Sequence, residues 1–222
     1  MTIDYYYDSW SLPCLTVQLA AKILNVKLNP ILKELSKGET HTPEYKQLNP
    51  QHTIPTIVDN GFVLSESRAI CKYLTEKYGS TTGAFSKDQL YPKDLQKRAT
   101  IDQRMDFDLG ALYRKISEYV TPVFSSGHYG TAALPKLKNA LEIMDAYLTK
   151  TEWLAGPEVT LADLPAITSI STLEVLGFDL TSYPNILRWF KAVKTTVPGY
   201  DEAVRKGIIE FNERVLSKLQ NN

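Results

Sequence analysis

NPQHTIPTIVDNGFVLSESRAICKYLTEKY (residues 49–78) is the stretch of sequence that decides the fold. A run rich in β-branched residues, 53–58, predicts a strand. Asp59-Asn60-Gly61 follows and supplies the positive φ angles of a tight hairpin, so 62–64 is predicted to be the returning strand. From Ser65 onward, apolar residues recur at intervals of three to four positions, which is typical of an amphipathic helix. The stretch therefore predicts a β-hairpin followed by a helix.

Pro55 could make the main chain before this hairpin available to a ligand. It is compatible with a strand-edge proline and equally with a cis Ile54–Pro55 bond, which would turn the main chain of Ile54 outward. An outward N–H and C=O can pair with a peptide-like ligand as an added strand would.

The start of the predicted helix is the second chemical feature. Helix N-termini present unpaired N–H groups and a partial positive charge, which suit a carboxylate, and Glu66 on the same turn could balance an ammonium group. The alternative is that Ser65 or Ser67 only caps the helix, with Glu66 and Arg68 as surface charges.

The segment NPQHTIPTIVDNGFVLSESRAI resembles the glutathione-binding segment of cytosolic glutathione S-transferases, nearly contiguously over twenty-two residues. NPQHTIP together with ESRAI most resembles the insect delta and epsilon classes. The resemblance implies a cis-proline at Pro55 and pairing of the Ile54 main chain with the cysteinyl part of glutathione. It also implies Glu66 and Ser67 at the γ-glutamyl end with Arg68 nearby. His52 and Thr53 are implied to lie toward the glycyl carboxylate.

Composition excludes several classes of protein. The 222 residues include 25 basic and 25 acidic side chains, a balance that points neither to nucleic acid nor to an anionic membrane surface. Cys14 and Cys71 are too few for a disulfide scaffold and lack metal-ligand spacing, so we expect a reducing compartment and no metal site. No apolar run approaches the length of a membrane span, and the N-terminus does not read as a signal peptide. We therefore expect a cytoplasmic protein.

The first part of the chain predicts alternating strands and helices. Strands are expected at 3–7 and 28–35, with a helix after Pro13 between them and a short helix at 43–48. Together with the hairpin and the following helix, this gives the order βαβ, α, ββα. That order is the thioredoxin-like arrangement of the resembling family, whose active site lies between the first strand and the first helix.

The turn Asp8-Ser9-Trp10-Ser11-Leu12-Pro13-Cys14 occupies that position. Thioredoxin-like redox proteins carry two cysteines three residues apart here, but Ser11 replaces the first, which argues against two-thiol exchange. A serine hydroxyl at a helix N-terminus can donate a hydrogen bond to a bound thiolate and favour its charged form. Ser-x-Pro-Cys also resembles the delta/epsilon active-site turn, which implies Ser11 as the catalytic residue.

Two departures leave alternatives open. The turn is one residue longer than the usual delta pattern and places Trp10 before the serine, so Ser9 is a substitute candidate, as is Tyr7 at the end of the first strand. Cys14 is interpreted as a packed small residue. Delta and epsilon proteins usually carry a histidine where this chain has Thr40. His41 could reach the glycyl end of glutathione instead, or be a solvated loop residue.

Beyond residue 79 the sequence becomes helical. We expect a thioredoxin-like domain over 1–79, a linker of small and polar residues over 80–87, and an all-helical domain over 88–222. Within the last domain, long helical patterns cover 88–119, 134–148, 186–196 and 200–219. Thr160-Leu161-Ala162-Asp163 predicts a capping box, and its surroundings resemble the core of the family's C-terminal domain.

The family binds its second substrate, a hydrophobic electrophile, between the two domains. The residues of this chain that the resemblance and their helical spacing place there are Trp10, Tyr113, Ile116, Tyr119, Val120, Phe124 and Phe211. Aromatic residues at such spacing also occur in ordinary cores, so core packing is the alternative. An apolar pocket with few polar groups would suit a range of hydrophobic electrophiles.

These observations predict a glutathione S-transferase of the delta/epsilon type that uses glutathione as co-substrate, needs no metal or prosthetic group, and forms a homodimer. The alternative is a protein of the same fold that binds or sequesters hydrophobic ligands with little turnover, suggested by the altered turn and by Thr40. Glutathione-dependent disulfide or peroxide reduction is a third activity, which Ser11 disfavours as the main one.

Overall fold

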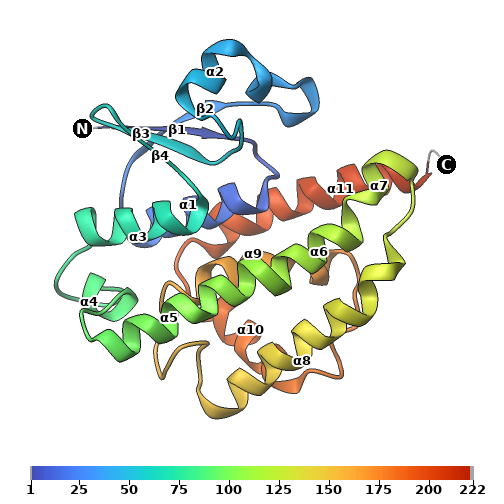
Figure 1. Cartoon of the computed structure of the whole chain (residues 1–222). Coiled ribbons are helices and arrows are strands. Elements are labelled where there is room, and N and C mark those ends of the chain that lie inside the picture. The colour runs from blue at the N-terminus through green and yellow to red at the C-terminus, as the bar shows by residue number, and fades with distance from the viewer. Residues whose placement is uncertain (1, 221–222) are drawn as a thin grey trace.

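The computed structural model describes residues 2–220. Figure 1 shows a small sheet with one helix on its upper side and two beneath it, and these two separate the sheet from a larger group of helices. The elements of the sheet-bearing part are β1 (Ile3–Tyr7), α1 (Leu12–Ile23), β2 (Leu28–Leu32), α2 (Pro43–Leu48), β3 (Thr56–Asp59), β4 (Phe62–Ser65) and α3 (Ser67–Tyr78). The predicted order βαβ, α, ββα is confirmed.

The sheet has the strand order β2-β1-β3-β4. β1 runs parallel to β2, with Tyr5 opposite Pro30, and antiparallel to β3, with Tyr5 opposite Ile57. The predicted hairpin joins β3 to β4, with Ile57 opposite Leu64. Its turn has positive φ at Asn60 and Gly61, which Asn and Gly tolerate better than other residues.

Two strands are shorter than the sequence pattern predicts. β2 ends at Leu32, because the chain then turns into a 3-10 helix at Leu35–Lys37, whose first N–H donates to the carboxylate of Asp8 at 2.9 Å. β3 begins at Thr56 rather than Thr53, whose carbonyl accepts hydrogen bonds from side chains of the α2 region instead of joining the sheet.

Asp59 anchors the end of the hairpin to α3. Its side chain is 1% exposed, and its Oδ2 accepts hydrogen bonds from the Tyr73 hydroxyl at 2.6 Å, the Tyr78 hydroxyl at 2.6 Å and the Lys77 ammonium at 2.7 Å. Burial alone would raise the pKa of Asp59, but these bonds outweigh it and lower the pKa to about 2.

Asp59→Asn is expected to lower the free energy of unfolding by an amount that depends on pH. The folded-state pKa of about 2 lies below the ordinary value of 3.8, so the contribution of Asp59 is present above about pH 4 and is lost as the pH falls toward 2. Urea unfolding at pH 7, 5, 4 and 3 should show a difference between wild type and variant that shrinks as the pH falls. A difference that stays constant over this range would contradict the assignment.

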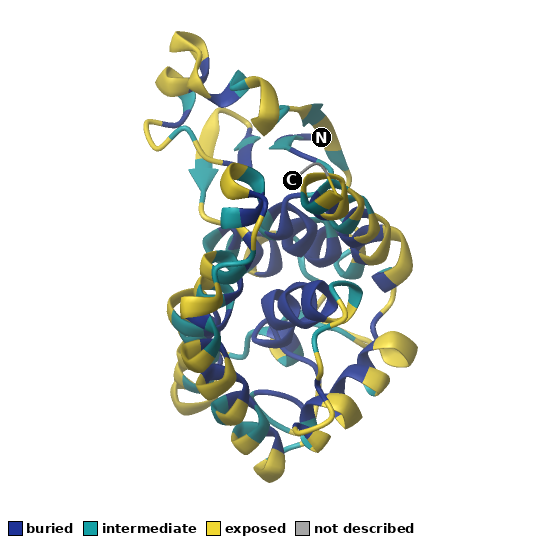
Figure 2. Cartoon of the chain, turned by 90° about the vertical axis from the view of Figure 1, so that its right-hand side faces the viewer, coloured by how far each residue is buried: buried dark blue, intermediate teal, exposed yellow. Residues whose placement is uncertain are grey.

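The second part of the chain is helical. Its α-helices are α4 (Lys87–Leu90), α5 (Leu95–Phe107), α6 (Tyr113–Val120), α7 (Pro122–Ser126), α8 (Leu134–Lys150), α9 (Asp163–Val175), α10 (Pro184–Thr196) and α11 (Lys206–Gln220). Figure 2 shows buried segments, in dark blue, gathered within a surround of exposed ones. α9 belongs to this interior, and eleven of its thirteen residues are buried.

The predicted helix over 88–119 is interrupted in two places. Residues 91–94 are not helical, because Asp94 caps a new start by accepting the N–H of Lys97 at 2.9 Å. Leu95, which belongs to the predicted apolar pattern, is therefore the first residue of α5 and is 81% exposed. A π-helical segment, Asp108–Leu112, then separates α5 from α6.

The capping segment before α9 is built around a buried carboxylate. Asp163 accepts the N–H groups of Thr160 at 2.9 Å and Leu154 at 3.0 Å, and the indole N–H of Trp189 at 3.0 Å. Burial raises the pKa of Asp163 to about 6, although these hydrogen bonds oppose the shift. Of the predicted capping box, the bond from the Thr160 N–H to the Asp163 carboxylate is confirmed, but Thr160 as the N-cap is wrong: α9 begins at Asp163, and the Thr160 hydroxyl accepts the N–H of Ala162 at 3.3 Å. The bond from Trp189 joins the start of α9 to α10.

The two parts of the chain meet along α1. This helix packs against α3 on one side and α9 on the other, with a hydrogen bond of 3.1 Å between the hydroxyls of Thr16 and Thr168. α11 approaches the start of α1 so closely that a Cβ on Gly207 would lie 2.4 Å from the carbonyl oxygen of Ser9. Within residues 2–220, no helix combines the length and apolarity that a membrane crossing requires.

Candidate active site

The turn that leads from β1 into α1 is fixed at both ends. The N–H of Ser11 donates to the carbonyl of Asp8 at 3.2 Å, and Pro13 occupies the first turn of α1, where a missing N–H costs nothing. Ser11 is the N-cap residue, but its side chain makes no capping hydrogen bond with the helix. The residue is 8% exposed and lines a cavity, so its hydroxyl and the first N–H groups of α1 lie in one region.

Ser9 and Tyr7, the two alternatives to Ser11, do not line this cavity. The Ser9 hydroxyl donates to the carboxylate of Glu210 on α11. Burial raises the pKa of Glu210, but the bonds from Ser9 and Arg214 lower it by more, so the net shift is downward. Tyr7 stacks on Tyr5 within the sheet, with ring centroids 5.3 Å apart. The cavity geometry therefore favours Ser11.

Cys14 is packed as the sequence predicts. It is fully buried, and burial raises the pKa of its thiol to about 11, although hydrogen bonding to the side chain of Ser11 opposes the shift. The phenol of Tyr5 donates to its carbonyl at 2.7 Å. Such a thiol stays protonated at neutral pH and is a poor nucleophile.

The segment before β3 contains a residue, Ile54, whose main-chain groups are free to bind a ligand. The Ile54–Pro55 peptide bond is cis, as the resemblance implies. The carbonyl of Thr53 is held by the Tyr45 hydroxyl at 2.8 Å and by the Asn49 amide at 3.0 Å. Within the described residues, neither the N–H nor the C=O of Ile54 takes part in a hydrogen bond, so both remain for a ligand.

His41 and His52 lie side by side at one end of this segment, with ring centroids 4.4 Å apart. The resemblance places Thr40 at the position of the family's histidine; Thr40 is buried at 1% exposure, whereas His41 is exposed. The 3-10 helix Glu39–His41 carries the imidazole of His41 next to that of His52.

The start of α3 lies at the other end of the segment. Glu66 is the N-cap residue with φ of 68° and is exposed, and Ser67 behind it is buried. Neither Ser65 nor Ser67 caps the helix, so the simple capping interpretation of these serines is wrong. The side chain of Arg68 forms an ion pair with Asp108 that is buried on both sides.

Asp108 is a residue that the sequence did not suggest. Its second carboxylate oxygen accepts the hydroxyl of Ser169 at 2.9 Å, so the π-helical segment, α3 and α9 are tied together through it. Burial raises the pKa of Asp108, and the neighbouring guanidinium of Arg68 opposes the shift. The ring of Tyr113 lies 5.8 Å from the Arg68 guanidinium. Only a three-dimensional contact reveals this role, because forty residues separate the partners.

A cavity of about 330 Å³ lies where the two parts of the chain face each other, beside Ser11. The residues that line it are Trp10, Ser11, Leu12, Pro13, Leu35, Tyr113, Ile116, Ser117, Val120, Thr121, Phe124 and Phe211. Six of the seven residues predicted for the electrophile site are among them. The exception is Tyr119, which stacks on Tyr129 at 4.7 Å away from this cavity. A helix residue one position from Val120 points in a different direction, which explains the difference.

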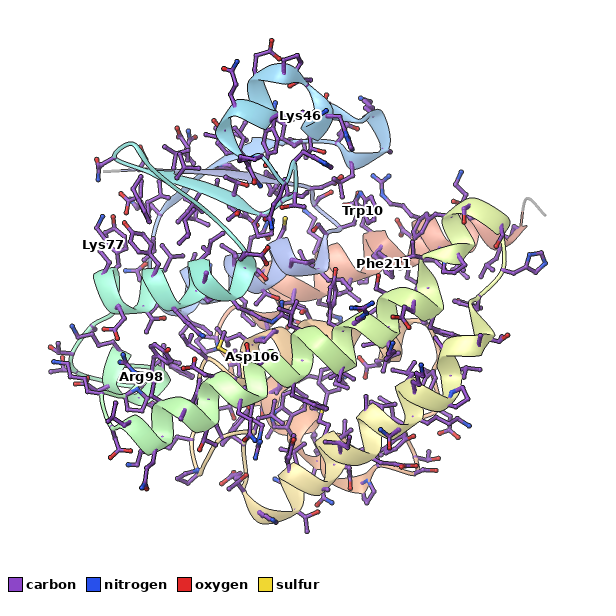
Figure 3. All side chains as sticks on the ribbon, viewed as in Figure 1. Trp10, Lys46, Lys77, Arg98, Asp106 and Phe211 are labelled. Atoms are coloured by element: carbon purple, nitrogen blue, oxygen red, sulfur yellow. The ribbon has the colours of Figure 1, made fainter. Side chains whose placement is uncertain are left out.

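Aromatic rings form one side of the cavity. Trp10 stacks with Phe124 at 5.9 Å and with Phe211 at 6.1 Å between ring centroids. Figure 3 labels Trp10 above Phe211, where the sheet-bearing part faces α11. Leu35, which sequence analysis did not place here, enters because β2 ends early. The lining is mainly apolar, with Ser11 as a hydroxyl beside the helix N-terminus.

A family model described as the glutathione S-transferase N-terminal domain matches residues 5–76, and one described as the C-terminal domain matches residues 102–195. A delta-class glutathione transferase from Nilaparvata lugens is similar at 44% identity with a TM-score of 0.91, covering 97% of this chain and 99% of that one.

Two further structures show the same similarity. A glutathione transferase from Bombyx mori is 38% identical with a TM-score of 0.90, covering 96% of this chain and 97% of that one. An epsilon-class glutathione S-transferase from the housefly, Musca domestica, is 31% identical with a TM-score of 0.88, covering 97% of this chain and 98% of that one.

Proposed function

This chain belongs to the glutathione S-transferase family and conjugates glutathione, and from that premise we propose that the hydroxyl of Ser11 activates the thiol for attack on hydrophobic electrophiles. The observation that carries the proposal is the position of Ser11 at the N-terminus of α1 and on the wall of an apolar cavity. A thiolate there would accept the Ser11 hydroxyl and lie in the positive end of the helix dipole. Both effects lower a thiol pKa.

Glutathione would bind in extended form along the segment before β3. Its cysteinyl part would pair with the main chain of Ile54, beside Pro55 and Thr53. Its glycyl carboxylate would lie toward His41 and His52. The γ-glutamyl end would lie at the start of α3, where Glu66 can face the ammonium group and Ser67 the carboxylate, with Arg68 held behind them by Asp108. These residues together form the proposed glutathione site.

The reaction then needs only the two substrates. The thiol loses its proton to solvent, the thiolate sulfur forms a bond to the electrophilic carbon, and a leaving group such as chloride departs in substitution reactions. Glutathione supplies the nucleophile itself, so the proposal includes no metal or prosthetic group. We also propose that residues 1–79 bind glutathione, that 80–87 is a linker, and that 88–222 supplies most of the electrophile site. A cytoplasmic location is part of the same proposal.

Steady-state conjugation of glutathione to 1-chloro-2,4-dinitrobenzene tests the proposal against the ligand-binding alternative. The wild type should exceed the uncatalysed rate by a large factor, with saturation in both substrates. Tight binding of glutathione and hydrophobic ligands without turnover would instead support the sequestering protein, which the lengthened turn at Trp10 motivates.

We infer that the protein works as a homodimer. The family resemblance motivates this, and Phe62 at 49% and Leu95 at 81% exposure, one on each part of the chain, are apolar side chains that a second copy could cover. Light scattering should give twice the chain mass for the wild type. The double variant Phe62→Glu, Leu95→Glu should have a measured mass closer to that of the monomer. Leu187→Glu, a control at another exposed leucine, should keep the mass of the wild type. A monomeric wild type would rule out the inference.

A further inference from the structure

A second cavity of about 470 Å³ adjoins the Ser11 cavity on its outer side. It is lined by Trp10, Leu35, Ser36, Phe124, Arg214, Ser217 and Lys218. Three of these residues, Trp10, Leu35 and Phe124, line both cavities. They form the boundary between an inner cavity at Ser11 and an outer cavity bounded by α7 and α11.

Trp10 is the centre of this boundary. Its ring stacks with Phe124 and Phe211, and the guanidinium of Arg214 lies 5.1 Å from its ring centroid. Trp10 lies in the turn between β1 and α1, directly before Ser11. A ligand that reaches from the inner to the outer cavity must therefore run along an aromatic surface and end near Arg214.

The charges that line the outer cavity have one sign. Among the described residues that line it, Arg214 and Lys218 are basic and none is acidic. Three carboxylates that neighbour the lining residues along the chain or contact them already accept hydrogen bonds: Glu210 accepts Ser9 and Arg214, Asp8 accepts the N–H of Leu35, and Glu34 accepts the ammonium of Lys37. Arg214 donates to Oε1 of Glu210 from Nε and from Nη2. Within residues 2–220, Nη1 makes no hydrogen bond and can donate to another acceptor. The site suits the negative end of a largely apolar molecule.

We propose that the outer cavity is a subsite for the anionic end of amphipathic electrophiles whose reactive end lies beside Ser11. This inference rests on the proposed function. The substrates would be aryl or alkyl electrophiles that carry a carboxylate at the end opposite the reactive group. Enones with a distal carboxylate are one example. The thiolate sulfur bonds to the terminal alkene carbon, the π pair moves to the carbonyl as an enolate, and the enolate takes a proton from water, so nothing leaves and nothing is oxidised.

Ethacrynic acid and its methyl ester form a matched pair of probes, because both carry the same enone and differ in one distal negative charge. Arg214→Gln should lower kcat/KM for the acid about five- to tenfold, mainly through KM, and should leave the ester and 1-chloro-2,4-dinitrobenzene within twofold of wild type. Arg214→Lys, which keeps the charge, should retain much of the preference for the acid. Added salt should weaken the preference in the wild type.

Arg205→Gln is the matched control, because Arg205 is exposed and pairs with an acid four residues earlier, as Arg214 does, but lines neither cavity. It should leave all three substrates unchanged. Equal losses for the acid and the ester in Arg214→Gln, or no loss for either, would overturn the subsite. The chlorodinitrobenzene rate of the wild type reports the proposed function separately, so failure of that function and failure of the subsite give different results.

Discussion

Ser11→Ala is expected to lower the turnover of 1-chloro-2,4-dinitrobenzene by about 10- to 100-fold while glutathione still binds. Losing a hydrogen bond to a charged group costs about 1.5–3 kcal/mol, and each 1.4 kcal/mol is a factor of ten. The pH at which the rate becomes half-maximal should rise, because the bound thiol loses a donor that favours its thiolate. Steady-state kinetics between pH 5.5 and 9 measures both effects.

The same substitution should leave the fold intact. The Ser11 side chain makes no capping bond, and its one described hydrogen bond is the weak one to the Cys14 thiol, so the thermal midpoint should change little. Ser9→Ala and Tyr7→Phe are the matched controls, because each removes one hydroxyl close to the turn but outside the inner cavity. If one of these controls lowers the rate more than Ser11→Ala does, the assignment of the thiolate donor is wrong.

Asp163→Ala is expected to cost about 3–5 kcal/mol of unfolding free energy, because it removes a buried charged acceptor and strands its donors. Those donors are the N–H groups of Leu154 and Thr160 and the indole of Trp189, all within 3.0 Å of the carboxylate. Urea unfolding followed by far-UV circular dichroism measures the loss.

Two further variants make that result interpretable. Asp163→Asn keeps one acceptor oxygen, so its free energy of unfolding should lie between those of the wild type and of Asp163→Ala. It should therefore stay folded even if the alanine variant does not. Asp179→Ala removes an exposed carboxylate that also accepts a nearby main-chain N–H, at 2.9 Å from Thr181, and should cost far less. Equal losses for the buried and the exposed aspartate would show that burial does not set the cost.

The fold was predictable because its signals are local. The hairpin depends on Asn60 and Gly61, whose positive φ angles the sequence predicts directly. The helices of the second part follow from apolar periodicity, and the bond between Thr160 and Asp163 before α9 follows from their spacing, although Thr160 is not the N-cap. The pattern failed at 91–94, where a cap at Asp94 restarts the helix inside an otherwise continuous apolar repeat.

The candidate site was predictable where it lies on a contiguous motif, and where the resemblance and helical spacing placed residues such as Tyr113 and Phe211 at the cavity. The segments around Ile54 and Glu66 are of the first kind. Asp108 could not be found this way, because its role comes from a contact with Arg68 across the two parts of the chain. Leu35 was missed because β2 ends early, and Tyr119 was misplaced because adjacent helix positions differ in direction by about a quarter turn or more.

The burial of both cysteines has a consequence for the durability of such an enzyme. A catalyst that handles thiol-reactive compounds risks being alkylated by its own substrates. Cys14 and Cys71 are fully buried, and burial raises the pKa values of their thiols to about 11 and about 12. An electrophile in the inner cavity therefore meets neither cysteine, because both are buried outside its lining and protonated, and the thiolate of bound glutathione is the sulfur open to attack on it.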